Sequence, residues 1–404
     1  MPIIVQKFGG TSVGNIERIK HVAALVLKEK AKGNTPVVVV SAMAGFTDQL
    51  VEYAKAISNL TAFTDVQEYD VTLASGEQIT AALLALALHE RDCKARSWLG
   101  WQLPIHTDGT FGNAKIKQID TAPLLEALDN GVIPVISGFQ GIHQGRVTTL
   151  GRGGSDTTAA AVAAALKAER CDIYTDVTGV FSADPRLVPN ARKLKQLSFE
   201  EMLELSSSGA KVLHSRSVEM AMRYNLKMQV LSSFSDEPGT MLVSEEELME
   251  ENIVTGIVCS ADEICVTLSG LSKTANATAQ VFAAVAQGNV SIDMIVQNTH
   301  DGEITLSFTV TAFDSEKTEA ALASLKGELF AEMQLSPIVS QVSVVGVGMR
   351  RHTGTAKRMF EILAQQNIEV LAISTSEIKI SALIPKDKKE FAVRALHTGF
   401  DLDI

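Results

Sequence analysis

The sequence is poor in aromatic residues and cysteines and has no long run of basic residues. Aromatic side chains make up 5% of its 404 residues and hydrophobic ones 46%, so we expect cores built from Ala, Val, Leu and Ile. The net charge of −11 and the lack of a basic stretch argue against nucleic acid as a partner. The cysteines lack CxxC spacing and are expected to be buried, reduced thiols. They are Cys93, Cys171, Cys259 and Cys265.

Signals for secretion and for membrane insertion are missing as well. No basic segment followed by an apolar one leads the chain, and no apolar run of about 18 residues follows. From these absences we expect a soluble, cytoplasmic protein with no membrane partner. We also predict no metal ligands among its side chains.

Familiar nucleotide-binding motifs do not occur. The chain has no GxxxxGK[ST], which excludes a Walker-type site, and it lacks the HRD and DFG motifs of protein kinases. The stretch GVGMRR at 346–351 begins like a dinucleotide fingerprint but lacks the third glycine. We therefore do not expect a cofactor loop there.

What the sequence does contain is a regular alternation of short apolar runs and helical patterns over roughly its first 235 residues. This alternation is typical of an α/β fold with a mostly parallel sheet covered by helices on both faces. The apolar runs are 3–8, 37–43, 132–139, 171–177 and 227–234. The helical stretches include 17–32, 76–91, 155–168 and 210–224.

The remaining part of the chain contains an internal repeat. Residues 280–295 recur at 358–373, and each copy has the order strand, helix, strand, strand, helix. Two copies of one unit predict two small α+β domains, a layout that suits a sensor more than a second active site. With the acidic stretch 244–252 as a linker, the predicted division is 1–245, 246–340 and 341–404.

Lys7 lies where the first predicted strand gives way to Gly9 and Gly10. Glycines let main-chain N–H groups approach a ligand closely, and a helix start follows near Asn15. Such donors form an anion site, in which Lys7 would be the point charge on a phosphate. The alternative is a glycine turn with a lysine that merely extends to solvent.

The strongest motif is TLGRGGSDTTA, in which glycines surround Arg152 and a helix begins near Ser155 and Asp156. A guanidinium suits bidentate binding of a carboxylate, and the glycines would let that carboxylate lie against the main chain. Asp156 alone could simply be a helix N-cap. A cation and an anion within one glycine loop nevertheless favour a functional site.

Three further stretches carry candidate residues. Thr175 and Asp176 end a predicted strand, where ligands of open α/β sheets bind, although the following 184–186 segment could be a plain turn with a surface ion pair. Glu77, in SGEQIT, is predicted at a helix start, where it is either a cap or an acidic site residue. His214, in GAKVLHSRSVE, is interpreted as a structural histidine.

Taken together and in this order along the chain, these motifs resemble aspartate kinase of the short monofunctional kind. The matching stretches are KFGGTSV, VVVVSAMAG, SGEQ, TLGRGGSDTTA, YTDVTGVFSADPR, GAKVLHSRSVE and ISTSEIKIS. The resemblance implies an amino acid kinase fold followed by two ACT domains of the ferredoxin-like type. It also implies Mg-ATP-dependent phosphorylation of the β-carboxylate of L-aspartate, at the entry to lysine, threonine and methionine synthesis, and a homodimer formed through the ACT domains.

The resemblance implies roles for individual residues. Lys7 and Asp156 would be catalytic. The residues matching the aspartate side are Ser41, Thr47, Glu77, Arg152 and Ser155. Those matching the ATP side are Lys7, Phe8, Gly9, Gly10, Thr175, Asp176, Phe181, Asp184, Arg186, Lys211 and Val212. Phe181 departs from the family, which commonly has Tyr there, so any hydroxyl contact to ATP is lost.

The resemblance further implies an amino acid effector, lysine or threonine, bound by the first repeat. The matching residues of the first repeat are Lys273, Asn276, Thr278, Asp293 and Gln297. Across the pocket, Glu369 and Val370 of the second repeat stand where the family usually has Asn and Ile. Lys273 stands where the family has an acid facing the effector ammonium, and like charges cost affinity. Asn276 replaces a glycine and tolerates a positive φ. We therefore expect weak or altered feedback inhibition.

Two other functions stay open. A different member of the amino acid kinase superfamily, acting on glutamate or acetylglutamate, would have the same fold. Glu77 and Arg152, which fit a free α-amino acid, speak against acetylglutamate, and the tandem repeat favours aspartate. A sensing module with an inactive kinase domain is the non-enzymatic alternative, against which all candidate catalytic residues are present.

Overall fold

The structure is a computed structural model that describes residues 1–60, 62–210, 212–248, 253–274 and 276–403. The chain forms two compact units. The first comprises Met1–Val180, Lys193–Ser206 and Lys211–Glu250. The second comprises Phe181–Arg192, Ser207–Ala210 and Glu251–Ile404. The segment 181–192, which contains several predicted ATP-side residues, therefore clusters with the C-terminal part of the chain.

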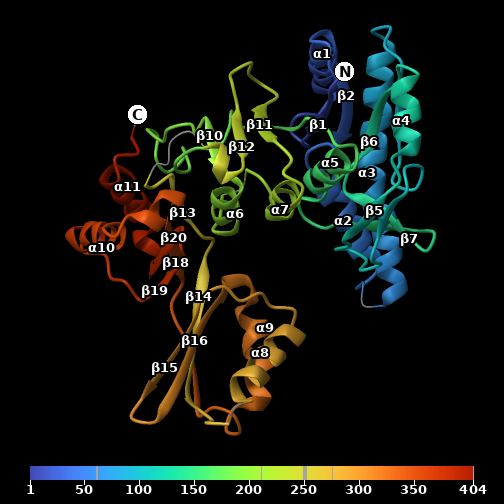
Figure 1. Cartoon of the computed structure of the whole chain (residues 1–404). Helices are drawn as coiled ribbons and strands as arrows, with labels where there is room; N and C mark the ends of the chain where they lie inside the picture. Colours follow the sequence, from blue (N-terminus) through green and yellow to red (C-terminus); the bar gives the residue numbers. More distant parts are fainter. Residues whose placement is uncertain (61, 211, 249–252, 275, 404) are drawn as a thin grey trace. The chain divides into compact units, whose positions relative to one another are not determined.

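The first unit is built on an eight-stranded sheet (Figure 1). Its strands, in order across the sheet, are β10 (Gln196–Ser198), β12 (Thr240–Val243), β11 (Met228–Ser232), β9 (Arg170–Thr175), β1 (Ile3–Phe8), β2 (Thr35–Val40), β6 (Ile133–Ser137) and β3 (Ala95–Trp98). All neighbouring strands are parallel except β11 and β12. The predicted mostly parallel α/β sheet is thus confirmed.

A smaller sheet and seven helices complete this part of the chain. The smaller sheet has the order β5 (Ile116–Ile119), β4 (Ile105–Thr107), β7 (Gln140–His143) and β8 (Arg146–Thr149). The helices in the described residues are α1 (Ile16–Ala31), α2 (Phe46–Ile57), α3 (Phe63–His89), α4 (Ala122–Asp129), α5 (Gly154–Ala165), α6 (Phe199–Ser207) and α7 (Ser215–Arg223).

Side-chain alternation along β1 separates the two faces of the large sheet. Phe8 belongs to a hydrophobic core in which α1 contributes Ile19 and Val22 and α3 contributes Leu84. Successive side chains of a strand point to opposite faces, so Lys7 points away from this core. On that other face α5 packs against β1 and α7.

Two predicted helix boundaries are wrong. Helix α3 begins at Phe63, not near residue 76, and Glu77 lies well inside it. Gly76 was misread as a boundary, but a Cβ there would lie 2.8 Å from the Cβ of Ala42, so the glycine lets the helix approach the end of β2. Helix α7 begins at Ser215, not at 210, with His214 as its N-cap.

Helix α3 has the length and the apolar composition of a membrane-spanning helix. Many of its residues are buried within the first unit, including the charged Asp70 and Glu77. The core helix of a soluble protein passes the same test, so this feature is weak support for a membrane span.

The second unit contains both copies of the internal repeat. The first copy is β14 (Glu263–Leu271), α8 (Ala277–Gln287), β15 (Ile295–His300), β16 (Glu303–Thr311), α9 (Ser315–Leu322) and β17 (Glu332–Leu335). The second is β18 (Val339–Val345), α10 (Thr355–Gln365), β19 (Ala372–Thr375), β20 (Lys379–Pro385) and α11 (Lys389–Gly399). The predicted order of strand, helix, strand, strand, helix is confirmed in both.

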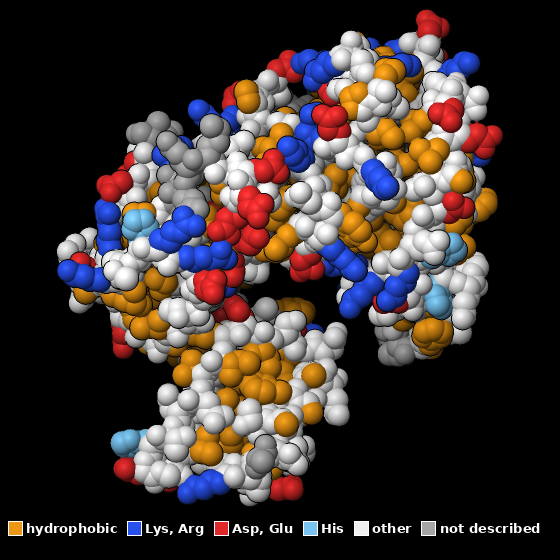
Figure 2. Space-filling model, viewed as in Figure 1, with side chains coloured by type: hydrophobic (Ala, Val, Ile, Leu, Met, Phe, Trp, Pro, Cys, Tyr) orange, Lys and Arg blue, Asp and Glu red, His pale blue; other side chains and the backbone are white. Residues whose placement is uncertain are grey.

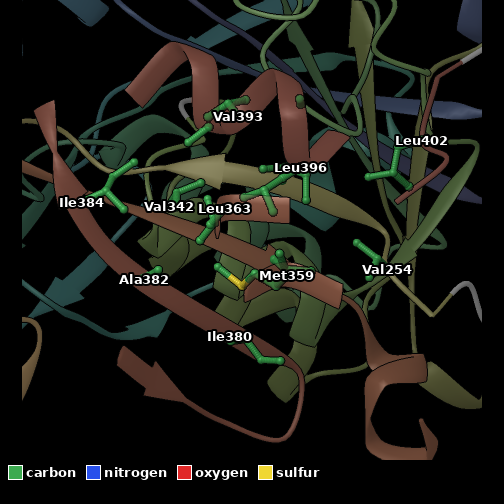
Figure 3. Packing of buried hydrophobic residues seen from close by; sticks show 14 of the residues in the cluster. Val254, Val342, Met359, Leu363, Ile380, Ala382, Ile384, Val393, Leu396 and Leu402 are labelled. Carbon is green, nitrogen blue, oxygen red and sulfur yellow. The ribbon is translucent and has the colours of Figure 1, made fainter. Parts of the chain in front are cut away.

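The strands of both copies form one eight-stranded sheet, in which β14 pairs with β18, and the copies differ in the additional strand that pairs with each of these two. In the first copy β17, which follows α9, pairs antiparallel with β14. In the second copy the strand beside β18 is β13 (Gly256–Cys259), which precedes both copies in the sequence. Val254 and Ile257 accordingly lie in the core of the second copy with Val342, Met359 and Leu396 (Figure 3). The division at 340/341 stays a prediction.

Surface features agree with the composition of the chain. Hydrophobic side chains gather over α8 and α9 (Figure 2), where Ala283, Ala284, Ala320 and Ala321 line a groove. The acidic stretch after β12 contains a short 3-10 turn, Glu245–Glu247. All four cysteines are free thiols, as expected, although Cys259 and Cys265 are only partly buried.

Candidate active site

Main-chain hydrogen bonds join the residues that follow β1, β2 and β6 to the ends of neighbouring strands at the carboxyl edge of the large sheet. The N–H of Gly9 donates to the carbonyl of Tyr174 at 3.1 Å, and that of Ser41 to the carbonyl of Phe8 at 3.0 Å. The N–H of Gly138 donates to the carbonyl of Val40 at 3.0 Å. Ligands of open α/β sheets bind at this edge. The candidate residues Gly9, Gly10, Ser41 and Asp176 lie in loops that directly follow its strands.

Lys7 and Asp156 form an ion pair at this edge. The Nζ atom of Lys7 is 2.6 Å from Oδ1 of Asp156, and both side chains are largely buried. Lys7 is only 8% exposed, so the alternative of a lysine extended into solvent is wrong. The N-cap of α5 is Gly153, so the alternative of Asp156 as a cap is wrong too.

The two glycines after β1 allow close approach of neighbouring groups. A Cβ on Gly9 would lie 3.4 Å from Nζ of Lys7, and a Cβ on Gly10 would lie 3.0 Å from the carbonyl oxygen of Ala42. Side chains at these positions would therefore crowd the lysine and the loop after β2. The ring of Phe8, by contrast, is fully buried and stacks on Tyr174, so only its main chain is left to face a ligand.

Glu77 reaches the same edge from the interior of α3. Its Oε1 accepts the N–H of Ala42 at 3.0 Å, while Oε2 is buried without a hydrogen-bond partner among the described residues. Burial raises the pKa of Glu77 to about 7, although the Ala42 hydrogen bond and the charge of Lys7 act in the opposite direction. A buried carboxylate oxygen without a donor is suited to bind a cationic ligand.

Arg152 lies in a loop whose conformation depends on glycine. Gly151 and Gly153, on either side of it, have φ values of +73° and +69°. The arginine is exposed and forms no ion pair or hydrogen bond with another described residue, so its guanidinium is available to a ligand. Ser155 follows in the first turn of α5, where Gly138 makes room for it, since a Cβ on that glycine would lie 2.8 Å from the Cβ of Ser155.

The remaining residues of the aspartate side lie after β2. Ser41 follows the strand directly, and Thr47 is the second residue of α2. Both are partly buried. Ala42, which lies between them in the sequence, donates its N–H to Glu77. The loop after β2 therefore brings Ser41 near the buried carboxylate of Glu77.

The predicted ATP-side residues are divided between the units. Thr175 ends β9 in the first unit, and its hydroxyl donates to Asp176 at 3.1 Å. In the second unit Phe181 packs against the core of the second copy, and Asp184 pairs with Arg186 at 2.7 Å. Val212 is partly buried, and Lys211 lies outside the described residues.

Sequence reasoning did not single out Phe139, although the structure places it beside the site. It follows β6 with an unusual φ of +67°, and its ring would contact a Cβ on Gly154 at 2.7 Å. A non-glycine residue at positive φ is uncommon, and the constraint here comes from packing against α5. The sequence offered only the Gly138–Phe139 pair after an apolar run as a signal.

The candidate effector residues are exposed or partly buried. Thr278 in α8 donates to Oε1 of Gln297 in β15 at 3.2 Å, which brings these two predicted residues together. A Cβ on Gly302 would lie 3.1 Å from Nζ of Lys273, so Lys273 reaches the turn between β15 and β16. Asn276 has a φ of −95° and does not use the left-handed region that we considered for it.

The other predicted effector residues are placed separately. Asp293 precedes β15, and its N–H donates to the carbonyl of Thr309 at 3.2 Å. Glu369 is exposed and Val370 packs against the core of the second copy. Ala275 lies outside the described residues.

Comparison with known proteins shows to which family the chain belongs. The profile of the Amino acid kinase family matches residues 2–232, and that of the ACT domain matches residues 264–326 and 342–400. The chain is 49% identical over 405 residues to aspartokinase from Geobacillus stearothermophilus, covering 100% of this chain and 98% of the relative. Aspartate kinase from Pseudomonas putida is 47% identical over 407 residues with the same coverage. The chain belongs to the aspartate kinase family.

A solved structure agrees with this assignment. Aspartokinase III from E. coli in complex with aspartate and ADP has a TM-score of 0.82 and 27% identity, covering 98% of this chain and 99% of that one. As an aspartate kinase, the chain is a phosphotransferase that uses ATP to phosphorylate aspartate and carries ACT regulatory domains. The alternatives of another substrate and of an inactive sensing module are thereby set aside.

Proposed function

We propose that the loops at the carboxyl edge of the large sheet in the first unit bind aspartate and transfer the γ-phosphoryl group of ATP to its side-chain carboxylate, giving 4-phospho-L-aspartate. The observation that carries this proposal is the convergence of Lys7, Asp156 and Glu77 at that edge. They come from a strand and two helices, and all three are buried or nearly so.

The aspartate side would be recognised by charge. Glu77, with its unpartnered Oε2, would accept hydrogen bonds from the substrate ammonium, while Arg152 would bind the α-carboxylate in bidentate fashion. Ser155, Ser41 and Thr47 would add hydroxyl groups around the side chain that reacts. These contacts orient the β-carboxylate so that one of its oxygens attacks the γ-phosphorus atom of ATP in line, while the bond from that phosphorus to the β–γ bridging oxygen breaks and ADP leaves.

Lys7 would stabilise the transfer itself. Phosphoryl transfer needs positioning and cancellation of charge on the phosphoryl oxygens more than covalent help from the protein. The ammonium of Lys7 lies on a rigid strand end, and Asp156 holds it in place at 2.6 Å. Gly9 and Gly10 leave room for the phosphate beside it.

We further propose that ATP contacts the main chain of Phe8–Gly10, together with Thr175, Asp176, Phe181, Asp184, Arg186, Lys211 and Val212, and that it is bound with Mg²⁺. The described residues contain no group of three or more side chains suited to hold a metal. This fits Mg²⁺, which keeps several waters and is often held through nucleotide phosphates. When bound, the ion would neutralise charge on the phosphates.

Regulation and assembly are proposed from the repeat. We expect the ACT domains to bind lysine or threonine through the residues around α8 and β15, with weak or altered inhibition because of Lys273. We also propose that the chain forms a homodimer through these domains, lies in the cytoplasm, and supplies the synthesis of lysine, threonine and methionine.

Trapping of the acyl phosphate with hydroxylamine tests the catalytic proposal. With ATP and magnesium, L-aspartate should yield the hydroxamate, whereas N-acetyl-L-aspartate, which lacks the ammonium that Glu77 would bind, should react poorly. L-Glutamate, which differs by one methylene, is the matched control for side-chain length. Equal rates with aspartate and its N-acetyl derivative would contradict the role of Glu77.

A further inference from the structure

The start of α7 contacts the glycine-rich loop (residues 150–154) through an arginine that sequence reasoning did not consider. Arg216 donates from Nη1 to the carbonyl oxygen of Leu150, at the start of this loop. The same atom is 3.3 Å from Oδ1 of Asn113, and Nη2 donates to the carbonyl oxygen of Ala114 at 2.9 Å. One guanidinium thus joins two segments that are far apart in the sequence.

Both positive-φ glycines of the loop pack against this arrangement. A Cβ on Gly151 would lie 2.8 Å from Oδ1 of Asn113, which is also an acceptor for Arg216. A Cβ on Gly153 would lie 2.3 Å from the Cβ of His214, the N-cap of α7. His214 in turn accepts the N–H of Arg216 through Nδ1 at 3.4 Å.

The glycine-rich loop needs such external contacts. Glycines lose more conformational freedom on folding than other residues, so a loop with three of them, Gly151, Gly153 and Gly154, is costly to order. Arg152 lies between these glycines, is exposed, and forms no hydrogen bond or ion pair with another described residue. Its position is therefore set by the main chain on either side.

The guanidinium of Arg216 is chemically suited to holding the glycine-rich loop. Its donors lie in a rigid plane and can serve several acceptors at once, whereas a lysine ammonium acts as a single point charge. Burial lowers the pKa of Arg216, and the nearby charges of Glu219 and Asp108 oppose this effect. Moving a cation out of water costs free energy, and the hydrogen bonds of Arg216 to the carbonyl groups of Leu150 and Ala114 offset part of this cost.

We propose that Arg216, together with Asn113 and His214, is a positioning residue for aspartate, because it fixes the glycine-rich loop and with it the guanidinium of Arg152. The proposal rests on the proposed role of Arg152 in binding the α-carboxylate. Arg216 itself does not touch the substrate. Arg216 affects the affinity for aspartate indirectly, through its hydrogen bond to the main-chain carbonyl of Leu150.

Steady-state kinetics of the full chain test this proposal. Arg216→Met should raise the KM for aspartate about tenfold, because it removes hydrogen bonds from a charged donor to the loop, while the KM for ATP stays within about twofold. Arg223→Met, on the same helix but exposed over Tyr224, is the matched control and should leave both constants unchanged. If Arg216→Met does not fold, Arg216→Lys carries the test, since its single ammonium cannot span the same acceptors.

A double-mutant cycle separates positioning from a general loss of structure. If Arg216 acts through Arg152, adding Arg216→Met to Arg152→Ala should raise the KM for aspartate no further. Additive effects, or equal increases in KM for both substrates, would overturn the proposal. If Arg152→Ala alone leaves the KM for aspartate unchanged, the proposed function of Arg152 fails instead. Normal aspartate kinetics in the Arg216 variants together with a defect in Arg152→Ala would overturn only the present inference.

Discussion

The candidate active site and the candidate effector loop both depend on charged side chains, but they place them in opposite environments. In the first unit Lys7 is 8% exposed and paired with Asp156, and Glu77 is 4% exposed. In the first copy of the repeat Lys273 is exposed and reaches the tight turn at Gly302. The same residue type therefore lies in a buried ion pair in one region and on an open surface in the other.

This difference in burial determines how strongly a substitution of a charged residue in each region can change activity. Two charges interact far more strongly in a partly buried site than in water, and solvent and salt screen exposed charges. Exposed ion pairs are worth little, with a typical value near 0–1 kcal/mol. We therefore expect substitutions in the first region to change catalysis strongly and those in the second to change only regulation.

The largest effect is expected for Lys7→Met. Removing one preorganised charge at the transferring phosphoryl group should lower kcat roughly a hundredfold, or about 3 kcal/mol, with a smaller change in the KM for aspartate. Lys28→Met is the matched control, because Lys28 pairs with Asp236 at the same 2.6 Å but in an exposed position. A Lys7 variant that kept more than half of the wild-type kcat would contradict the catalytic role of the buried ion pair.

The second-largest effect is expected for Glu77→Gln and should be seen in the pH dependence of the KM for aspartate. Because the pKa of Glu77 is about 7, its carboxylate ionises as the pH rises through neutrality, and the affinity for the aspartate ammonium should rise with it. The Gln variant should have a KM for aspartate raised roughly tenfold at pH 8 and a flatter profile between pH 6 and 8. Glu68→Gln, exposed on the same helix, is the control and should behave as wild type.

The same substitution should also change how the stability of the protein depends on pH. A carboxyl group with a raised pKa keeps its proton in the folded protein between its ordinary value of 4.5 and about 7, where the unfolded chain has lost it. The free energy of unfolding should therefore fall as the pH rises through this window, by about 3 kcal/mol, and level off above it. Denaturant unfolding of Glu77→Gln should lack this decrease. An unchanged pH slope would show that Glu77 is ionised in the folded state throughout.

The smallest effect on catalysis is expected for Lys273→Asp. Its side chain is exposed and lies in the unit that does not contain Lys7, so kcat without effector should stay within about 20% of wild type. Inhibition by millimolar lysine or threonine should become stronger, since an acid then faces the effector ammonium. Lys317→Asp, on α9 of the same copy, is the control. Unchanged sensitivity in the Lys273 variant would remove this residue from the effector site.

Much of the architecture could be predicted from local patterns. The alternation of apolar runs and helices predicted the parallel sheet, and the internal repeat predicted two α+β units. Lys7, Arg152 and Asp156 were found because they stand next to glycines and at the ends of regular elements. These signals are local in the chain, and steric rules for glycine and the side-chain period of strands act over a few residues only.

Other features depended on residues that meet only in the fold. Gly76 was read as the start of a helix, yet it is needed where α3 approaches Ala42. The strand that completes the second copy comes from residues 256–259, before the first copy begins, and no repeat pattern marks it. Arg216 was passed over because its acceptors, Leu150 and Ala114, are distant in sequence.

Local patterns in the sequence thus predicted the class of fold and the repeat, and they indicated the glycine-bordered charges that we propose for the site. The packing of distant segments decides which of these charges are paired, which carboxylate oxygen of Glu77 lacks a donor among the described residues, and which side chain donates to the glycine-rich loop. The physical reason is that hydrophobic periodicity and backbone sterics are properties of neighbouring residues. Burial, and with it the pKa of a carboxyl group or the need of an arginine for carbonyl partners, exists only after distant segments have packed together.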